Sequence, residues 1–379
     1  MSNDFLNTTH GVISCRGCHG GENVDDINLA HQNLVKSPSS PEWNGEGLAF
    51  GVCDKCHSDV GELYADSLHY TQNGFKTALE DYTHEGILEL DNPVSFTWQA
   101  NCSNCHADCG ECHVSRPRAQ NGGLLTGHFF EKEPPMKETC VGCHSTRNGA
   151  EFIGEVGPSA DTHYYDYDMV CTDCHEVSNF HGDGELPADM HAATDLPTCI
   201  SCHEDDMKAE NGIQAHTAHE PDLLDCTVCH SQEANGCQGC HVSFKDETKT
   251  GVTSHTDPLK AFKIAKNPNP NELHPYKYIA VRHIPQTAEM LEGVGYPNLE
   301  GYDQISNWQR SPTHNIQRFT PQNGDCNSCH GVAKVFLTND DILPTDSPAV
   351  KELVVDKIPD VIKKFRQKGG RKKCLRIIS

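Results

Sequence analysis

Two identical patterns of chemistry-bearing residues stand back to back in the stretch CSNCHADCGECH, between Cys102 and His113. Each pattern is Cys-x-x-Cys-His, and only Ala107 and Asp108 separate the two. Cysteines three positions apart lie on one face of a helical turn, so both thiols reach the two vinyl groups on one edge of a porphyrin. The His that follows then supplies an axial nitrogen to the iron. The stretch therefore predicts two covalently attached c-type haems close together.

Other metal sites fit this stretch less well. Its cysteines follow one another at steps of three, four and three, whereas the ferredoxin iron–sulfur pattern steps three, three and four and usually ends in proline. A zinc knuckle uses two Cys-x-x-Cys pairs, but it gives no reason for a His after each pair. Haem attachment explains both the spacing and the histidines.

The same motif occurs ten times along the chain and uses 20 of the 21 cysteines. The cysteines predicted to form thioethers are Cys15, Cys18, Cys53, Cys56, Cys102, Cys105, Cys109, Cys112, Cys140, Cys143, Cys171, Cys174, Cys199, Cys202, Cys226, Cys229, Cys237, Cys240, Cys326 and Cys329. The predicted proximal iron ligands are His19, His57, His106, His113, His144, His175, His203, His230, His241 and His330. Because only 24 of 379 residues are His, chance does not place one after every pair. The sequence predicts ten haem c groups.

With these motifs the chain resembles the multihaem, here decahaem, c-type cytochromes from Cys15 to His330. The resemblance implies respiratory electron transfer along closely packed haems, in the periplasm or outside the cell, with redox partner proteins or extracellular acceptors. Motif count does not separate a periplasmic carrier, a surface cytochrome that polymerises into a filament, and a multihaem reductase of a small nitrogen or sulfur oxyanion. We expect an electron carrier rather than an enzyme, and we name no catalytic residue.

Fourteen further histidines are candidates for the second axial position. They are His10, His31, His69, His84, His128, His163, His181, His191, His216, His219, His255, His274, His283 and His314. Ten would give every iron a second imidazole, and only six methionines are present, so we predict mostly bis-His, low-spin haems. Four of the fourteen histidines are then not needed as iron ligands. We expect His216 and His219 to compete for one position, as do His274 and His283, and we rank His181 last.

A repeat organises the middle of the chain. His163, His191 and His219 are each 28 residues apart, and the first cysteines of the three motifs that follow them are 28 and 27 residues apart. This period indicates a repeated unit in which each His ligates a neighbouring haem. We expect four regions: motifs one to four in 1–135, motifs five to nine in 136–250, a wrapping segment with motif ten in 251–345, and a helical basic tail in 346–379.

Composition predicts the fold class. The chain is 36% hydrophobic, and that count includes the cysteines. The polypeptide alone would bury a poor core, so we expect haems to form the interior of a mostly irregular chain with short α-helices and little β-structure. No apolar stretch reaches the ~20 residues of a membrane span. The start, MSNDFLNTTHG, lacks the features of a secretory signal, and we expect an exported chain whose leader is missing from this sequence.

The net charge and the last third of the chain support three further predictions. The net charge of −24 disfavours nucleic acid and anionic lipid as partners.

The motif-free gap 242–325 is either a wrapping segment or a lid over an open iron, with Lys260, Lys263 or Tyr278 near the substrate. In the tail, Ser347 precedes Pro348 as a helix cap. Its unpaired Cys374 is an inert thiol, an intermolecular disulfide or part of a contact with an acidic partner.

Overall fold

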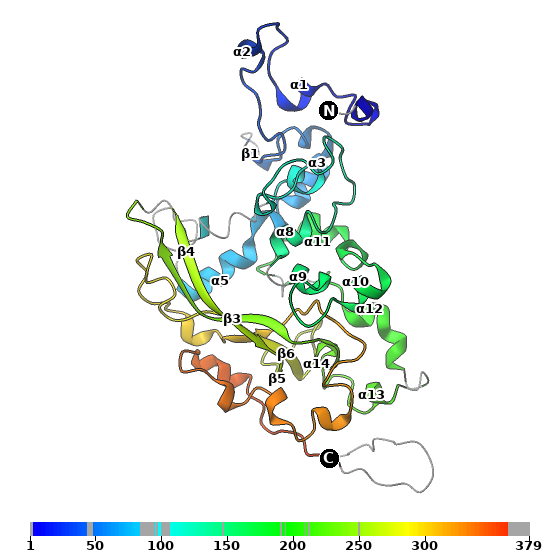
Figure 1. Cartoon of the computed structure of the whole chain (residues 1–379), viewed down its shortest axis with the longest axis vertical. Helices are drawn as coiled ribbons and strands as arrows, with labels where there is room; N and C mark the ends of the chain where they lie inside the picture. Colours follow the sequence, from blue (N-terminus) through cyan, green and yellow to red (C-terminus); the bar gives the residue numbers. More distant parts are fainter. Residues whose placement is uncertain are drawn as a thin grey trace. The chain divides into compact units, whose positions relative to one another are not determined.

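The computed structural model describes residues 3–43, 48–83, 95, 98–99, 107–145, 148–189, 192–193, 195–208, 210, 213–248 and 251–362. The chain is mostly irregular, with 34% helix in short helices and 14% strand in small sheets, which confirms the predicted fold class (Figure 1). No helix among the described residues is both long enough and apolar enough to cross a membrane.

Two compact units interleave along the chain. Unit 1 contains residues 1–78, 98–146 and 170–196, and unit 2 contains residues 79–97, 147–169 and 197–379. The units therefore do not follow the four consecutive regions expected from the sequence. Motifs one to six belong to unit 1, and motifs seven to ten belong to unit 2.

Unit 1 consists of short helices around a small aromatic cluster. Phe50 is fully buried, and its ring packs edge-on against the rings of Tyr64 and Tyr70 at 5.2 and 4.9 Å. The Tyr64 hydroxyl donates to the Ala107 carbonyl at 2.8 Å, which fixes the chain two residues before the fourth motif. The elements are η1 (Asn3–Asn7), α1 (Cys15–His19), α2 (Ile27–Ala30), β1 (Glu42–Trp43), β2 (Leu48–Ala49), α3 (Asp54–Tyr64), α4 (Leu68–Thr71), α7 (Cys109–His113), η4 (Arg118–Gln120), α8 (Cys140–His144), η5 (Cys171–Asp173) and α11 (Val177–His181), with α5 (Asn73–Thr83) continuing into unit 2.

Unit 2 contains the larger sheets. Strands β5, β6 and β7 form an antiparallel sheet, while β3 and β4 pair as a long antiparallel ribbon (Figure 1). The elements are α9 (Asn148–Ile153), α10 (Thr162–Tyr167), α12 (Cys199–His203), η6 (Glu204–Met207), α13 (Gln214–Thr217), α14 (Cys226–His230), β3 (Ala234–Phe244), β4 (Val252–Ala261), β5 (Lys263–Lys266), β6 (Tyr278–His283), η8 (Tyr302–Gln304), β7 (Trp308–Arg310), η9 (Cys326–Ser328), η10 (Ala333–Val335), η11 (Asn339–Asp341) and η12 (Pro348–Glu352).

The segment expected to wrap haems builds an apolar core instead. Ile279 and Val281, two residues apart on β6, point to the same face and pack with Trp308. Ile264 of β5 joins a second cluster that includes Val228, which lies inside the eighth motif. This sheet therefore supports a motif helix directly, and the polypeptide buries more apolar surface of its own than the composition suggested.

The tail differs from the helix expected there. The Ser347 hydroxyl accepts a hydrogen bond from the Ala349 amide at 3.2 Å, so the predicted cap is present, but only the 3-10 helix η12 follows it. Beyond it the chain extends alongside β5, because the Lys266 amide donates to the Leu353 carbonyl at 2.9 Å and the side chains of Leu353 and Val355 are both buried. Residues 363–379, which include Cys374 and eight of the ten Lys and Arg residues of the tail, lie outside the described part of the chain.

Candidate haem sites

Eight of the nine described motifs form a helical turn. They lie in α1, α3 with its preceding Cys53, α7, α8, η5, α12, α14 and η9. Side chains just before the first cysteine begin several of these turns by accepting backbone N–H groups: Ser14, Asp108, Thr198, Asp225 and Asp325. The turn brings the two thiols to one face, as attachment to a porphyrin edge needs. The third motif, with Cys102, Cys105 and His106, lies outside the described residues.

The ninth motif is an exception to the helical turn expected from its spacing. Cys237 and Cys240 lie within strand β3, where Cys237 pairs with Pro258 of β4. The register shifts between Gln238 and His241, and Gly239 adopts a φ of +61° at this irregularity. Pairing with β4 therefore replaces the local helix, and the bulge changes the direction of the strand between the two cysteines.

Among the residues that the structure describes, seven pairs of histidine rings lie close together, and each pair joins one motif His to one His outside the motifs. The pairs, with the distances between ring centres, are His10–His57 at 6.2 Å, His19–His128 at 6.2 Å, His69–His144 at 6.3 Å, His113–His181 at 6.0 Å, His163–His203 at 6.0 Å, His216–His230 at 6.1 Å and His219–His330 at 6.3 Å. Each pair lies within a single unit.

These distances fit two imidazoles on opposite sides of one iron. An imidazole nitrogen binds a metal at roughly 2 Å and the ring centre lies about 1 Å beyond it, so two such rings have centres about 6 Å apart. Unliganded histidines packed in a core have no reason to repeat one distance seven times. The residues present therefore fit seven bis-His iron sites.

Hydrogen bonds to Nδ1 orient several of these rings so that Nε2 is left to bind a metal. Nδ1 of His113 lies 2.6 Å from the Glu131 carbonyl oxygen, and Nδ1 of His203 lies 2.8 Å from an Asp206 carboxylate oxygen. Nδ1 of five other paired rings has an oxygen partner in the same way: His19, His163, His216, His230 and His330. A proton on Nδ1 leaves Nε2 as the lone-pair nitrogen, which is the arrangement that a metal-binding His needs.

Burial keeps some of the paired rings neutral. Burial, together with the nearby His144, lowers the pKa of His69 to about 4. Burial first and a neighbouring ring second also lower the pKa values of His10, His181 and His219. Because the folded pKa of His69 lies below the ordinary value, its ring stays neutral at pH 7, and a neutral imidazole is the form that binds iron.

The ring pairs group individual histidines differently from the sequence-based expectations. His216 lies by His230 and His219 lies by His330, so each has a motif His of its own beside it. His181, ranked last, lies 6.0 Å from His113. The cap of α11 positions His181: Gly182 has a φ of +81°, and a Cβ there would lie 2.5 Å from the Leu63 carbonyl oxygen.

The remaining candidates are placed differently. His283 is 2% exposed, and both its ring nitrogens have oxygen partners, the Cys237 carbonyl at 2.9 Å and the Asp346 carboxylate at 2.6 Å. These partners occupy both ring nitrogens, which disfavours His283 as an iron ligand. His31 has Nδ1 at 2.6 Å from the Ile27 carbonyl oxygen. His255 lies on β4, and His274 and His314 lie in the loops next to β6 and β7. His84 and His191 lie outside the described residues.

Cysteines of different motifs touch one another. The Cys53 thiol is hydrogen-bonded to Cys109, Cys140 to Cys171, and Cys199 to Cys226. Weaker electrostatic interactions link Cys18 with Cys53, Cys112 with Cys140, and Cys229 with Cys329. These contacts give a spatial order of motifs one, two, four, five and six in unit 1, and seven, eight and ten in unit 2.

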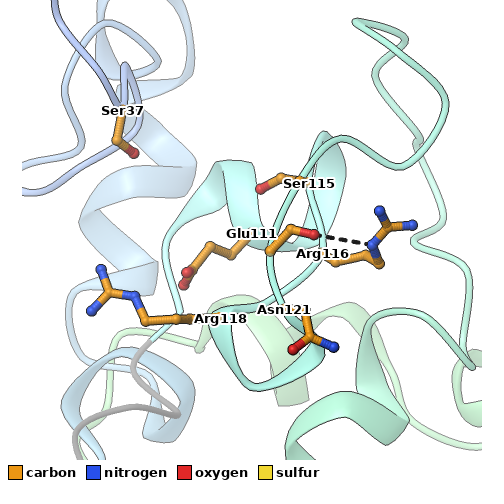
Figure 2. Close-up of a pocket in the computed structure, with 8 residues that line it drawn as sticks. Ser37, Glu111, Ser115, Arg116, Arg118 and Asn121 are labelled. Carbon is orange, nitrogen blue, oxygen red and sulfur yellow. Dashed lines mark hydrogen bonds between the residues drawn. The ribbon is translucent and has the colours of Figure 1, made fainter.

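A polar pocket of ≈ 330 Å³ lies beside the fourth motif. Figure 2 shows Glu111 and Arg118 extending to the same side of it, while Arg116 turns the other way and its Nε donates to the Gly122 carbonyl at 3.1 Å. Burial and the nearby Asp108 raise the pKa of the Glu111 carboxyl, while the charge of Arg118 lowers it in part. The lining is polar rather than apolar, so the pocket offers charge partners to carboxylates and not a cavity for an apolar ligand.

The residues proposed for an open catalytic site have structural partners instead. Lys263 forms an ion pair with Asp341 and donates to the Lys334 carbonyl at 3.0 Å. The backbone of Tyr278 pairs with the segment before the eighth motif, since the Asp225 amide donates to its carbonyl at 2.9 Å. Lys260 is an exposed residue of β4. The contacts of Lys263 and Tyr278 thus join strands β5 and β6 to neighbouring segments.

The capping residue of the fourth motif, Asp108, is expected to contribute measurably to the free energy of unfolding. Asp108 Oδ1 accepts from the Glu111 amide at 3.1 Å and from the Ser39 hydroxyl at 2.6 Å, which joins the turn to the segment before motif two. Asp108→Ala removes both bonds, and we expect a loss of about 1–2 kcal/mol in the free energy of unfolding. Denaturant titration followed by circular dichroism measures it. Asp108→Asn keeps an acceptor and should lose much less; equal losses would contradict the capping role.

Comparison of the chain with protein-family models, with curated proteins and with solved structures finds no match in any of the three.

Proposed function

We propose that the chain is a decahaem c-type cytochrome that conducts electrons between redox partners through closely packed bis-His haems. The observation that carries this proposal is the set of seven histidine pairs, each of one motif His and one other His, with ring centres 6.0–6.3 Å apart. Two imidazoles on one iron leave no open position for a substrate, so this coordination favours electron transfer over catalysis at these sites.

Each type of residue has a separate role in holding the haems. When bound, each haem iron takes up and releases one electron. The cysteines would hold the porphyrin edge, the paired imidazoles would bind the iron, and the carbonyl and carboxylate partners of Nδ1 keep the imidazoles in place. The Arg118 guanidinium group beside motif four is a suitable partner for a haem carboxylate.

The contacts between motifs support short transfer steps. Because Cys53 touches Cys109 and Cys140 touches Cys171, the haems attached there would be close neighbours, as would those attached at Cys199 and Cys226. Attachment outside the cytoplasm, a redox partner of complementary basic charge and assembly of copies into a filament are further parts of the proposal. Electron microscopy of the purified protein distinguishes single particles from filaments.

Mass spectrometry of the protein matured in a host with c-type haem attachment tests the central claim. We expect the mass of the chain plus ten haem groups, and a low-spin spectrum in both oxidation states. The host must also mature a control c-type cytochrome in the same experiment. If the protein from that host has the mass of the bare chain, the proposal is contradicted.

A further inference from the structure

The two imidazoles of one ring pair, His163 and His203, both have a carboxylate at Nδ1. Nδ1 of His163 lies 2.8 Å from Oδ1 of Asp161, and Nδ1 of His203 lies 2.8 Å from Oδ2 of Asp206. The two ring centres are 6.0 Å apart, as expected of two ligands of one iron. Because His203 belongs to motif seven, the haem attached there would have a carboxylate behind each axial ligand.

The other paired rings named above with a partner at Nδ1 have a neutral one. In each case it is a backbone carbonyl oxygen, and the rings are His19, His113, His216, His230 and His330. The last three belong to the sites of motifs eight and ten, which follow motif seven in the spatial order of unit 2. The two carboxylates therefore fall on one site and are not spread over several.

A carboxylate at Nδ1 acts on the iron through the ring. An ionised carboxylate carries a full negative charge, whereas a carbonyl group has only a dipole, so the carboxylate makes the imidazole a more basic ligand. A more basic ligand and a nearby negative charge both favour the oxidised iron, whose positive charge is higher by one. The reduction potential of a haem therefore falls when carboxylates take the place of carbonyls.

The two carboxylates differ in their surroundings. Asp161 is 2% exposed, and its position is fixed because Oδ1 also accepts from the His163 amide at 2.9 Å and Oδ2 accepts from the Ile316 amide at 2.7 Å. The Asp206 side chain is 52% exposed, and the charge of Arg318 also acts on it. Since water and a cation screen a negative charge, we expect Asp161 to have the larger effect on the haem.

We infer that Asp161 and Asp206 are positioning residues that lower the reduction potential of the haem of motif seven. This inference rests on the proposed function and adds a direction to it. Cys199 of motif seven is hydrogen-bonded to Cys226 of motif eight, so the two haems would be neighbours. A lowered potential at motif seven favours the passage of an electron from motif seven to motif eight over its return.

Asp206→Asn tests the inference, because asparagine keeps an acceptor for Nδ1 of His203 but removes the charge. The backbone carbonyl of Asp206, which lies 2.7 Å from Nδ1 of His216, is left in place. Potentiometric titration followed by visible absorption measures the potentials. At a fixed potential we expect the ratio of reduced to oxidised iron to rise about tenfold at one haem, a shift of about +59 mV, while all haems stay low-spin. Asp161→Asn should shift the same haem at least as far.

Two further variants identify the haem and control for net charge. His163→Ala makes the haem of motif seven high-spin and so distinct in absorption, and Asp206→Asn added to this background should shift the high-spin haem. Asp205→Asn removes the same charge one residue away, from a carboxylate that forms an ion pair with Lys208. We expect Asp205→Asn to shift the high-spin haem much less than Asp206→Asn does.

The other outcomes overturn the inference. Potentials that stay unchanged in Asp206→Asn would remove the role of the carboxylates, and equal shifts in Asp205→Asn would assign the effect to net charge. A shift confined to low-spin haems in the His163→Ala background would place the effect at another site. Asp161→Asn turns an amide toward the Ile316 amide and loses stability, so Asp206→Asn decides if that variant does not fold. A preparation without haem in every variant would contradict the proposed function, whereas haem-loaded protein with unshifted potentials contradicts this inference alone.

Discussion

His69→Ala is expected to convert one of the ten haems from low-spin to high-spin and to let the reduced protein bind one molecule of carbon monoxide. The His69 ring centre lies 6.3 Å from that of His144, and burial keeps the ring neutral, with a pKa of about 4. Alanine offers no lone pair, so an iron held by His144 loses its sixth ligand. The high-spin signal should then equal one tenth of the total haem.

Phe180→Leu is the matched control for His69→Ala. The Phe180 ring lies 5.8 Å from His69 and 6.2 Å from His175, so it shares the same surroundings without offering a ligand. We expect this variant to keep all haems low-spin. If His69→Ala also stays fully low-spin and binds no carbon monoxide, the assignment of ring pairs to irons is wrong.

His283→Leu is expected to cost about 3–5 kcal/mol of the free energy of unfolding, the largest single effect on stability that the structure predicts. The side chains of His283 and Asp346 are 2% and 0% exposed, and their atoms Nε2 and Oδ1 are 2.6 Å apart. Nδ1 of the same ring lies 2.9 Å from the Cys237 carbonyl oxygen, so both ring nitrogens have oxygen partners. Leucine leaves the Asp346 carboxylate buried without its partner.

A double variant separates this effect from loss of packing. His283→Leu combined with Asp346→Leu removes both polar groups of the pair, and we expect it to be more stable than His283→Leu alone, because no polar group stays buried without its partner. Denaturant titration of the haem-loaded protein, followed by tryptophan fluorescence and circular dichroism, measures both. If the double variant loses as much as the sum of the two single variants, the pair is not coupled. The haem count should stay at ten, since His283 is not an iron ligand.

The sequence predicted the attachment turns well because their information is local. Two cysteines and a His within five residues, preceded by a capping residue such as Asp108 or Thr198, determine one short turn. The mostly irregular fold followed from composition for a similar reason. Motif nine was the exception, since a partner strand, which no local pattern reveals, decides its conformation.

The pairing of histidines could not be read from spacing. His219 lies by His330 and His10 by His57, far apart in the chain, and His163 lies by His203 rather than by His175 of the motif that follows it. Such pairs are set by how segments pack, not by periodicity. The sheet of unit 2 was missed likewise, because the apolar run at 278–281 becomes a strand only through its neighbours β5 and β7.

The interleaving of the two units constrains the order in which the protein can mature. A ribosome delivers residues 79–97 long before residues 197–379, yet both belong to unit 2, and unit 1 lacks its last segment until residue 196 has been made. Early segments of both units must therefore wait for late ones before they can form their contacts. No single cut yields either unit intact, so gene truncation or limited proteolysis at one site should release incomplete fragments.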